Sequence, residues 1–332
     1  MEGGDYEPEP HWKGHGNFAD ARAHYDINAG RSYERAKVVE KKKALDLVEP
    51  KLVSASRRQV ILVIDQTGSM GKRTGIIVSK LPYLEYEGQE YLGKDLDICF
   101  MAIGDATNHE DYPLQVRPFA KGADMKKRAD ELVIEAHGGG SMHETYELAA
   151  LYLARNLETP NAIEPPIVIF NGDEMPYDMV SADLAKRYAG ITLGRSIPTV
   201  DMFKELKRKC SVYMNVASYN DEKTRDDAMS SNTQKVYKAW VALLGEDHVG
   251  YLPDPERVVD VIFGIFAKET GRMGYFEQEL AGRQRPDQVA VVHKSLKTIH
   301  AATVSSDDDN DTDDDDDEDG KSVLIHWDKL GS

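Results

Sequence analysis

Three oxygen-bearing side chains occupy alternate positions directly after an apolar stretch of the chain. Asp65, Thr67 and Ser69 follow residues 60–64, whose sequence is VILVI. Consecutive apolar residues rich in β-branched types predict a strand that is buried on both faces, as in a parallel sheet. Open α/β sheets bind ligands at the carboxyl ends of such strands. One carboxylate and two hydroxyls are hard oxygen donors with little charge, which suits Mg²⁺ or Mn²⁺ better than Zn²⁺ or Ca²⁺.

Two later segments offer side chains of the same kinds. Residues 138–144, with the sequence GGGSMHE, form a glycine-rich loop that contains Ser141. Residues 167–173, with the sequence IVIFNGD, form a second buried strand and end at Asp173. Glycines allow the backbone to approach an ion closely while a neighbouring hydroxyl binds it. Thr145 is the alternative hydroxyl, but it lies one turn into the following helix, so Ser141 is the preferred ligand.

The order of these three motifs resembles the metal-ion-dependent adhesion site of von Willebrand factor A (VWA) domains. The resemblance covers residues 57–272. In one respect the chain departs from the family, because Asp173 follows Asn-Gly where the family usually has Thr-Asp-Gly. The resemblance implies an α/β fold with a doubly wound, mostly parallel sheet, helices on both faces and one antiparallel edge strand. It also implies a Mg²⁺ or Mn²⁺ site formed by Asp65, Thr67, Ser69, Ser141 and Asp173.

A protein-binding function follows from the same resemblance. The hydroxyls of Thr67, Ser69 and Ser141 would hold the ion, and Asp65 and Asp173 would bind it directly or through water. An open coordination position would then accept an Asp or Glu carboxylate from a partner protein. Intracellular VWA proteins without a membrane anchor often act as adaptors for MoxR-type AAA+ ATPases, so we expect a partner of that kind. We expect no enzyme activity, because no nucleophile and base stand at suggestive positions.

An enzymatic alternative uses the same acids. Residues 172–178 match the Gly-Asp-x(4)-Asp metal motif of phosphatases that resemble haloacid dehalogenases, with Asp65 as the nucleophile and Asp173 as a metal ligand. That mechanism requires a general acid two residues after the nucleophile to protonate the leaving group. The residue in that position is Thr67, which cannot serve. The adaptor hypothesis is therefore preferred.

Each of these motifs also has a simpler structural interpretation. A hydroxyl after a strand often caps the next helix, and a run of glycines can be an ordinary turn. Asp105 follows another predicted strand, where it either supports a metal ligand or lies in a solvated loop. His143 is most simply a surface residue at a helix start. Because all three motifs occur in the order that the VWA resemblance requires, the metal site is preferred over a separate explanation for each motif.

Strands and helices alternate along the rest of the predicted domain. Further strands are predicted at residues 97–105, 114–119, 210–217 and 248–252, and the second of these contains Pro118, which is typical of an edge strand. Helices are predicted at residues 71–84, 124–136, 144–155, 235–244 and 255–270. Such alternation implies right-handed crossovers and a parallel sheet.

Composition indicates a globular protein. Hydrophobic residues make up 41% and charged residues 30% of the 332 residues, and no apolar run approaches the ~20 residues of a membrane helix. The acidic start at residues 1–5 is unlike a secretory signal. Cys99 and Cys210 lie in or beside different predicted strands, so we expect unpaired buried thiols in a reducing compartment. We therefore expect a cytoplasmic protein that does not bind membranes.

The negative charge is concentrated near the C-terminus. Residues 307–319 contain 11 of the acids behind the net charge of −17, which leaves −6 for the rest. Without a basic face, nucleic acid is not an expected partner. The predicted organisation is an N-terminal polar and helical extension (1–56), the VWA domain (57–272), a C-terminal helical extension (273–304), an acidic disordered linker (305–320) and an apolar terminal peptide (321–332).

Overall fold

The fold is built around strand β2 (Arg58–Asp65). Val60 and Leu62 pack in one apolar cluster, while Ile61 and Val63 pack in a second cluster. Successive side chains of a strand point to opposite faces of the sheet, so the unbroken apolar run reflects burial on both faces. These observations come from a computed structural model, which describes residues 42–70, 72–108, 110–133, 135, 141–219 and 228–304.

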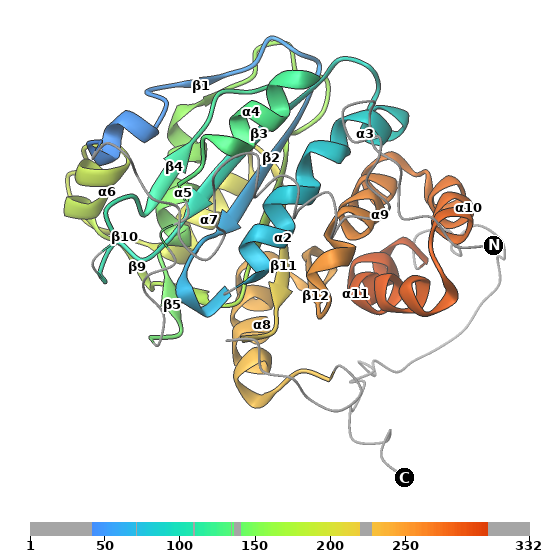
Figure 1. Cartoon of the computed structure of the whole chain (residues 1–332). Helices are drawn as coiled ribbons and strands as arrows, with labels where there is room; N and C mark the ends of the chain where they lie inside the picture. The colour runs from blue at the N-terminus through green and yellow to red at the C-terminus, as the bar shows by residue number, and fades with distance from the viewer. Residues whose placement is uncertain are drawn as a thin grey trace, which may run out of the picture.

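Five further strands complete the main sheet. They are β3 (Leu96–Ile103), β4 (Leu114–Val116), β7 (Ile167–Gly172), β11 (Ser211–Ala217) and β12 (Val249–Leu252). Their order is β12–β11–β7–β2–β3–β4 (Figure 1). All neighbours pair in parallel except β4, which is antiparallel to β3 at the edge. The chain builds one side of the sheet outward from β2 and then returns to build the other, so strand order reverses between β2 and β7.

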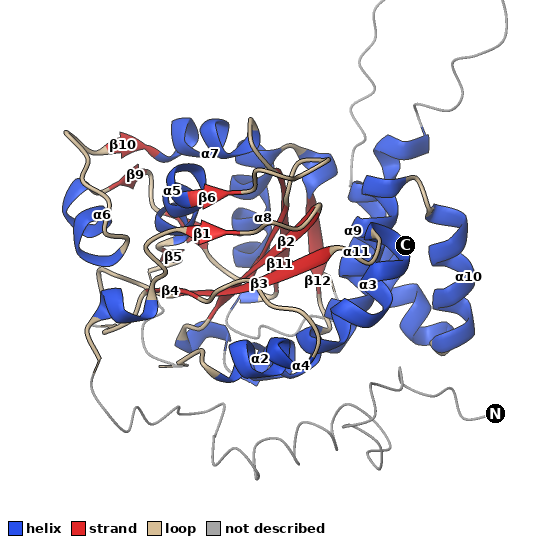
Figure 2. Ribbon diagram, turned by 90° about the horizontal axis from the view of Figure 1, so that it is seen from above, coloured by secondary structure: helices blue, strands red, loops and turns tan. Residues whose placement is uncertain are grey.

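Helices cover both faces of this sheet, as Figure 2 shows. One apolar cluster contains residues of α5 (Tyr146–Asn156), α6 (Ala182–Tyr188), α7 (Thr199–Lys207) and α8 (Ser231–Leu244). The other contains residues of α2 (Lys72–Lys80), α3 (Leu84–Leu92), α4 (Ala123–Asp130) and α9 (Val258–Thr270). The predicted α/β class, with a mostly parallel sheet and an antiparallel edge strand, is therefore confirmed.

Segments that come before and after the main sheet in the chain pack against the same two clusters. Near the N-terminal end, a 3₁₀ turn (Ala44–Leu47) precedes β1 (Leu52–Val53), which pairs in parallel with β6 (Leu157–Glu158). At the other end, α10 (Met273–Arg283) and α11 (Pro286–Val304) bury Phe276 and Leu296 in the cluster that contains α9. The predicted domain boundaries stay predictions, and residues 1–41, the acidic linker and the terminal peptide lie outside the described residues.

Several predicted elements have different limits in the structure. The helix expected at residues 71–84 ends at Lys80, and a 3₁₀ turn (Leu81–Tyr83) separates it from α3. Pro82 lies in this turn, and proline disfavours helical geometry in the residue before it. The helix expected from Glu144 begins at Tyr146 instead, because β5 (His143–Glu144) pairs in parallel with β8 (Met175–Pro176).

Other features match or extend the sequence predictions. Cys99 and Cys210 are buried and unpaired, as expected. Sequence patterns did not predict α6, α7 or the antiparallel pair β9 (Met179–Val180) and β10 (Ile197–Pro198). Within the part of the chain that the structure describes, no helix combines the length and apolar character needed to cross a membrane.

Candidate metal centre

A row of polar oxygens connects the carboxyl end of β2 with that of β7. The Thr67 hydroxyl donates to Asp65 Oδ1 at 2.6 Å, and the Ser69 hydroxyl donates to Asp173 Oδ1 at 2.9 Å. The two hydroxyl oxygens lie 3.0 Å apart. Both carboxylates are fully buried, while Ser69 keeps 7% of its surface exposed. The structure thus brings together four of the five residues that the sequence analysis selected.

The Asp65 carboxylate is held by donors from three segments. Besides the Thr67 hydroxyl, the Thr67 N–H donates to Oδ1 at 2.9 Å and the Tyr146 hydroxyl donates to Oδ2 at 2.6 Å. The backbone N–H of Asp173 also hydrogen-bonds to this carboxylate. Burial raises the pKa of Asp65, and the hydrogen bonds from Thr67 and Tyr146 act in the opposite direction. Among the described residues, no lysine or arginine forms an ion pair with Asp65.

The topology explains why these side chains meet. Asp65 is the last residue of β2, and Asp173 directly follows β7, its parallel neighbour. Strand order reverses between these two strands. Helices that leave neighbouring strands in opposite directions open a crevice at this point, which is where open α/β sheets bind ligands.

The third predicted hydroxyl is engaged elsewhere. The exposed Ser141 hydroxyl donates to the His143 carbonyl at 2.9 Å and accepts from the His143 N–H at 3.1 Å. It also hydrogen-bonds to the Tyr177 hydroxyl. The alternative, Thr145, is buried, and its hydroxyl donates to the Gly104 carbonyl. Neither hydroxyl has a hydrogen bond to the Asp65–Asp173 row within the described residues.

Gly172 explains the Asn-Gly-Asp sequence at the end of β7. A Cβ atom at this position would collide with the Tyr146 hydroxyl and lie 2.9 Å from Asp65 Oδ2. The absence of a side chain therefore leaves the space in which Tyr146 reaches Asp65. The glycine stands before the strand-terminal acid because this contact occupies that position.

Further buried carboxyl groups surround the row, and sequence patterns gave little sign of them. Glu144 and Glu174 are fully buried, and Glu147 and Glu110 are 1% and 4% exposed. Burial raises the pKa of all four carboxyl groups, to about 8 for Glu174 and about 9 for Glu110. Charged residues ordinarily indicate solvent exposure. Here Glu144 and Glu174 lie in or directly before the paired strands β5 and β8, whereas Glu147 lies in α5 and Glu110 lies between β3 and β4.

The end of β3 repeats the turn found at Asp65. Thr107 donates its N–H and its hydroxyl to Asp105 Oδ1 at 2.8 and 2.6 Å, and the Tyr177 hydroxyl lies 2.7 Å from that of Thr107. The His143 ring stacks on the Tyr177 ring with centroids 5.4 Å apart. The Asp-x-Thr pattern is thus first of all a turn. What distinguishes Asp65 is the second carboxylate, which is joined to it through Ser69.

The donor set of the row fits a hard divalent cation. Two carboxylates and two hydroxyls present only oxygen atoms, which Mg²⁺ and Mn²⁺ prefer. Within the described residues, no group of three or more histidine, cysteine, aspartate or glutamate side chains is arranged to hold a metal ion. A cation in the row would therefore depend on the hydroxyls of Thr67 and Ser69 as well as on the acids.

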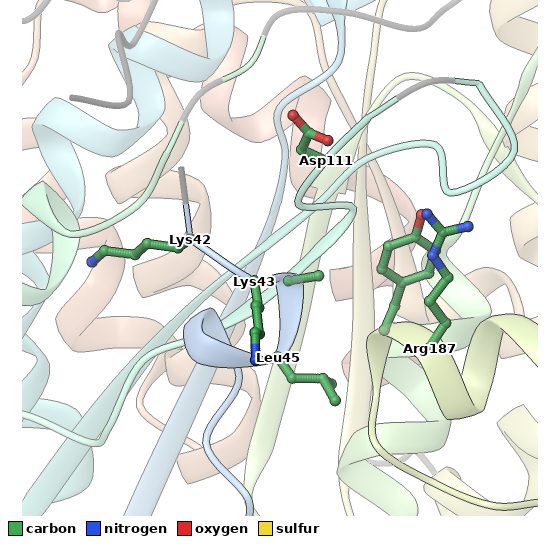
Figure 3. Close-up of a pocket in the computed structure, with 7 residues that line it drawn as sticks. Lys42, Lys43, Leu45, Asp111 and Arg187 are labelled. Carbon is green, nitrogen blue, oxygen red and sulfur yellow. The ribbon is translucent and has the colours of Figure 1, made fainter. Parts of the chain in front are cut away.

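A separate pocket lies on the surface beside α6. It has a volume of about 290 Å³ and is lined by basic side chains together with Leu45, Asp111 and Tyr188 (Figure 3). Lys42 extends away from the other labelled side chains, and the Arg187 guanidinium lies 4.9 Å from the centre of the Tyr188 ring. None of these residues belongs to the Asp65–Asp173 row.

The known structures described below are remotely similar to this chain. No family model and no curated protein matches the chain. The open form of the pilus adhesin SpaC from Lactobacillus rhamnosus GG is similar over 66% of this chain and 31% of its own, with 12% identity and a TM-score of 0.45. Proximal thread matrix protein 1 from the mussel byssus is similar over 64% of this chain and 47% of its own, with 10% identity and a TM-score of 0.41. This chain thus spans less than half of either protein, and likeness at this level carries no information about function.

We predict that Gly172→Ala disturbs the site. The added methyl group must push the Tyr146 hydroxyl away from Asp65, which should lower the free energy of unfolding by about 1–3 kcal/mol, as overpacking does. Gly194→Ala is the matched control, because a Cβ atom there meets nothing within 4 Å. The double variant Gly172→Ala with Tyr146→Phe should lose less stability than the two single variants lose together, because Tyr146→Phe removes the colliding hydroxyl. Urea denaturation measures all four variants, and equal stability of the two glycine variants would contradict this account.

We also predict that Glu110 makes the metal-free protein less stable at high pH. Its folded pKa of about 9 lies above the ordinary value of 4.5, so the folded state binds this proton more tightly than the unfolded chain does. The stabilisation is complete below pH 4.5 and is lost as the pH rises toward 9. In EDTA, the free energy of unfolding should therefore fall between pH 5.5 and pH 8.5, with up to about 4 kcal/mol from this group.

Glu110→Gln tests this contribution. The change removes the titrating group and should flatten the pH dependence of unfolding measured with urea. Glu164→Gln, at an exposed position, controls for the loss of one negative charge. If Glu110→Gln and the wild-type protein lose the same stability between the two pH values, the assigned role of Glu110 is wrong.

Proposed function

We propose that this chain is a VWA-type adaptor that binds a partner protein through Mg²⁺ or Mn²⁺. The observation that best supports this function is the row Asp65–Thr67–Ser69–Asp173, with two buried carboxylates joined by two hydroxyls at the point where strand order reverses. The order of the strands and the helices on both faces also favour the VWA arrangement.

The electrostatics of the row favour a cation. Burying an ionised carboxylate is unfavourable by several kcal/mol unless charge or hydrogen bonds offset it. Asp65 is fully buried and is held by hydrogen bonds alone. A hydroxyl carries both a donor hydrogen and acceptor lone pairs, so Thr67 and Ser69 can turn their lone pairs toward an ion.

Of the four residues of the row, Ser69 has the most exposed surface. Ser69 is partly accessible and follows the exposed Gly68, whereas Tyr146 closes the opposite side of Asp65 from within the apolar cluster. The chemistry that Mg²⁺ or Mn²⁺ supplies when bound is an open position for a partner carboxylate. In this proposal the chain's own residues hold the ion, orient it toward the surface and exclude water from behind it.

Ser141 remains the proposed third hydroxyl. Its side chain is exposed, and an ion would replace its local hydrogen bonds with His143 and the one with the Tyr177 hydroxyl. The buried Thr145 hydroxyl, by contrast, would have to release the Gly104 carbonyl. The partner class, an exposed Asp or Glu on a protein such as a MoxR-type AAA+ ATPase, rests on the VWA resemblance.

We predict that Ser69→Ala removes the stabilisation that Mn²⁺ confers by binding to the row. Binding to the native state adds RT ln(1 + [L]/Kd), or about 1–3 kcal/mol at millimolar ion. The melting temperature of the wild-type protein should rise when Mn²⁺ replaces EDTA, and that of Ser69→Ala should rise by less. Ser79→Ala is the matched control, because Ser79 is equally 7% exposed, and among the described residues its hydroxyl bonds only to the Ile76 carbonyl of α2. Asp65→Ala with Ser69→Ala should also lose partner capture in a pull-down, as EDTA does, and identical melting in Mn²⁺ and EDTA for the wild type would contradict the site.

The phosphatase alternative predicts turnover. We expect no hydrolysis of an aryl phosphate with Mg²⁺ above background, because Thr67 has no acidic proton to give to a leaving group. Its hydroxyl instead donates to Asp65 at 2.6 Å. Phosphate release measured for the wild type and for Asp65→Asn decides the matter. Activity that disappears in Asp65→Asn would replace the adaptor with an enzyme.

A further inference from the structure

Two glutamates beside the row have an unusual environment. Glu144 lies in β5 and Glu174 directly precedes β8, so the pairing of these short strands brings the two residues together. Their carboxyl groups lie within hydrogen-bonding reach of each other. Both side chains are 0% exposed. The pair is also close enough to Asp65 for mutual repulsion.

All four carboxylate oxygens of this pair lack a donor. Within the described residues, no N–H or O–H group donates to Glu144 or to Glu174. The neighbouring buried acids differ in this respect. Asp105 accepts hydrogen bonds from Thr107 and Tyr177, and Glu147 accepts one from the Tyr177 N–H. Buried polar groups in native proteins are almost always satisfied, and an exception indicates an unseen partner such as an ion.

A side chain from another protein cannot be that partner. Both carboxyl groups are closed to solvent, so the partner must be small. With both acids ionised the partner must also be positive, because a neutral water molecule would leave two like charges in contact inside the protein. A divalent cation meets both conditions, and Mg²⁺ and Mn²⁺ are commonly held by one or two carboxylates together with waters.

We propose that Glu144 and Glu174 form a second divalent-cation site, separate from the Asp65–Asp173 row. The two sites are distinct because, within the described residues, no three carboxylates are arranged around one ion. The second site consists of acids alone and has no hydroxyl ligand from the row. It goes beyond the proposed function and does not depend on it.

The test counts the Mn²⁺ ions bound to the full chain. The protein is dialysed to equilibrium against Mn²⁺ at physiological salt, which weakens binding to exposed acids, and the metal bound in excess of that in the dialysis buffer is measured by atomic absorption. We expect two ions per chain for the wild type and one for Glu144→Gln, for Glu174→Gln and for the double variant. Glu147→Gln is the matched control and should retain two ions, because Glu147 is equally buried but already satisfied.

A variant of the first site separates the two proposals. Asp65→Ala with Ser69→Ala should retain one ion if the glutamate site exists, whether or not the row binds metal in the wild type. Addition of Glu144→Gln to that variant should remove the last ion. The same ion count in the wild type and in the glutamate variants would overturn the proposal. The two acids would then share a proton in place of a cation. Loss of both ions from Glu144→Gln, where the wild type binds two, would also overturn it, in favour of one enlarged site. Circular dichroism verifies that each variant is folded.

Discussion

The structure depends on one carboxylate that is kept away from water. Asp65 ends the central strand with none of its surface exposed, where an unsatisfied charge would oppose folding by several kcal/mol. No lysine or arginine of the described residues offsets it by an ion pair. Hydrogen bonds from Thr67, Tyr146 and Asp173 do so instead. Because the donors come from three segments, the segments must be in place together for the charge to be buried.

The packing around the site follows from this requirement. Tyr146 is the first residue of α5, and its ring packs edge-on against Phe170 and Trp240, with centroids 6.2 and 5.1 Å away. Its hydroxyl is thereby aimed at the end of β2 from inside the core. Gly172 leaves the space for that contact, and the Thr74 hydroxyl donates to the Asp65 carbonyl at 2.7 Å from the first turns of α2. The apolar core therefore positions the polar site.

The sequence allows the strands and the row to be predicted because both depend on local patterns. Unbroken apolar runs identify β2 and β7, and the acids at their ends meet once the two strands are neighbours. The residues that surround the row are brought there by long-range contacts instead, which local patterns do not predict. A tyrosine in an amphipathic helix resembles any core residue, so Tyr146 carries no local signal. Glu144 resembles a solvated loop residue until the pairing of β5 with β8 buries it, and contacts with His143 and Tyr177 determine where Ser141 points.

The two groups of acids differ in what they do without a cation. Hydroxyls both donate and accept, so Thr67 and Ser69 can serve the carboxylates of the row by hydrogen bonds when no ion is bound. The row is thus suited to an ion that binds reversibly, as a reversible protein contact requires. Carboxylates only accept, and Glu144 and Glu174 have no donor among the described residues. A cation between them would have no substitute except a proton, so it should stay with the folded chain and stabilise the β5–β8 pairing beside the exchangeable site.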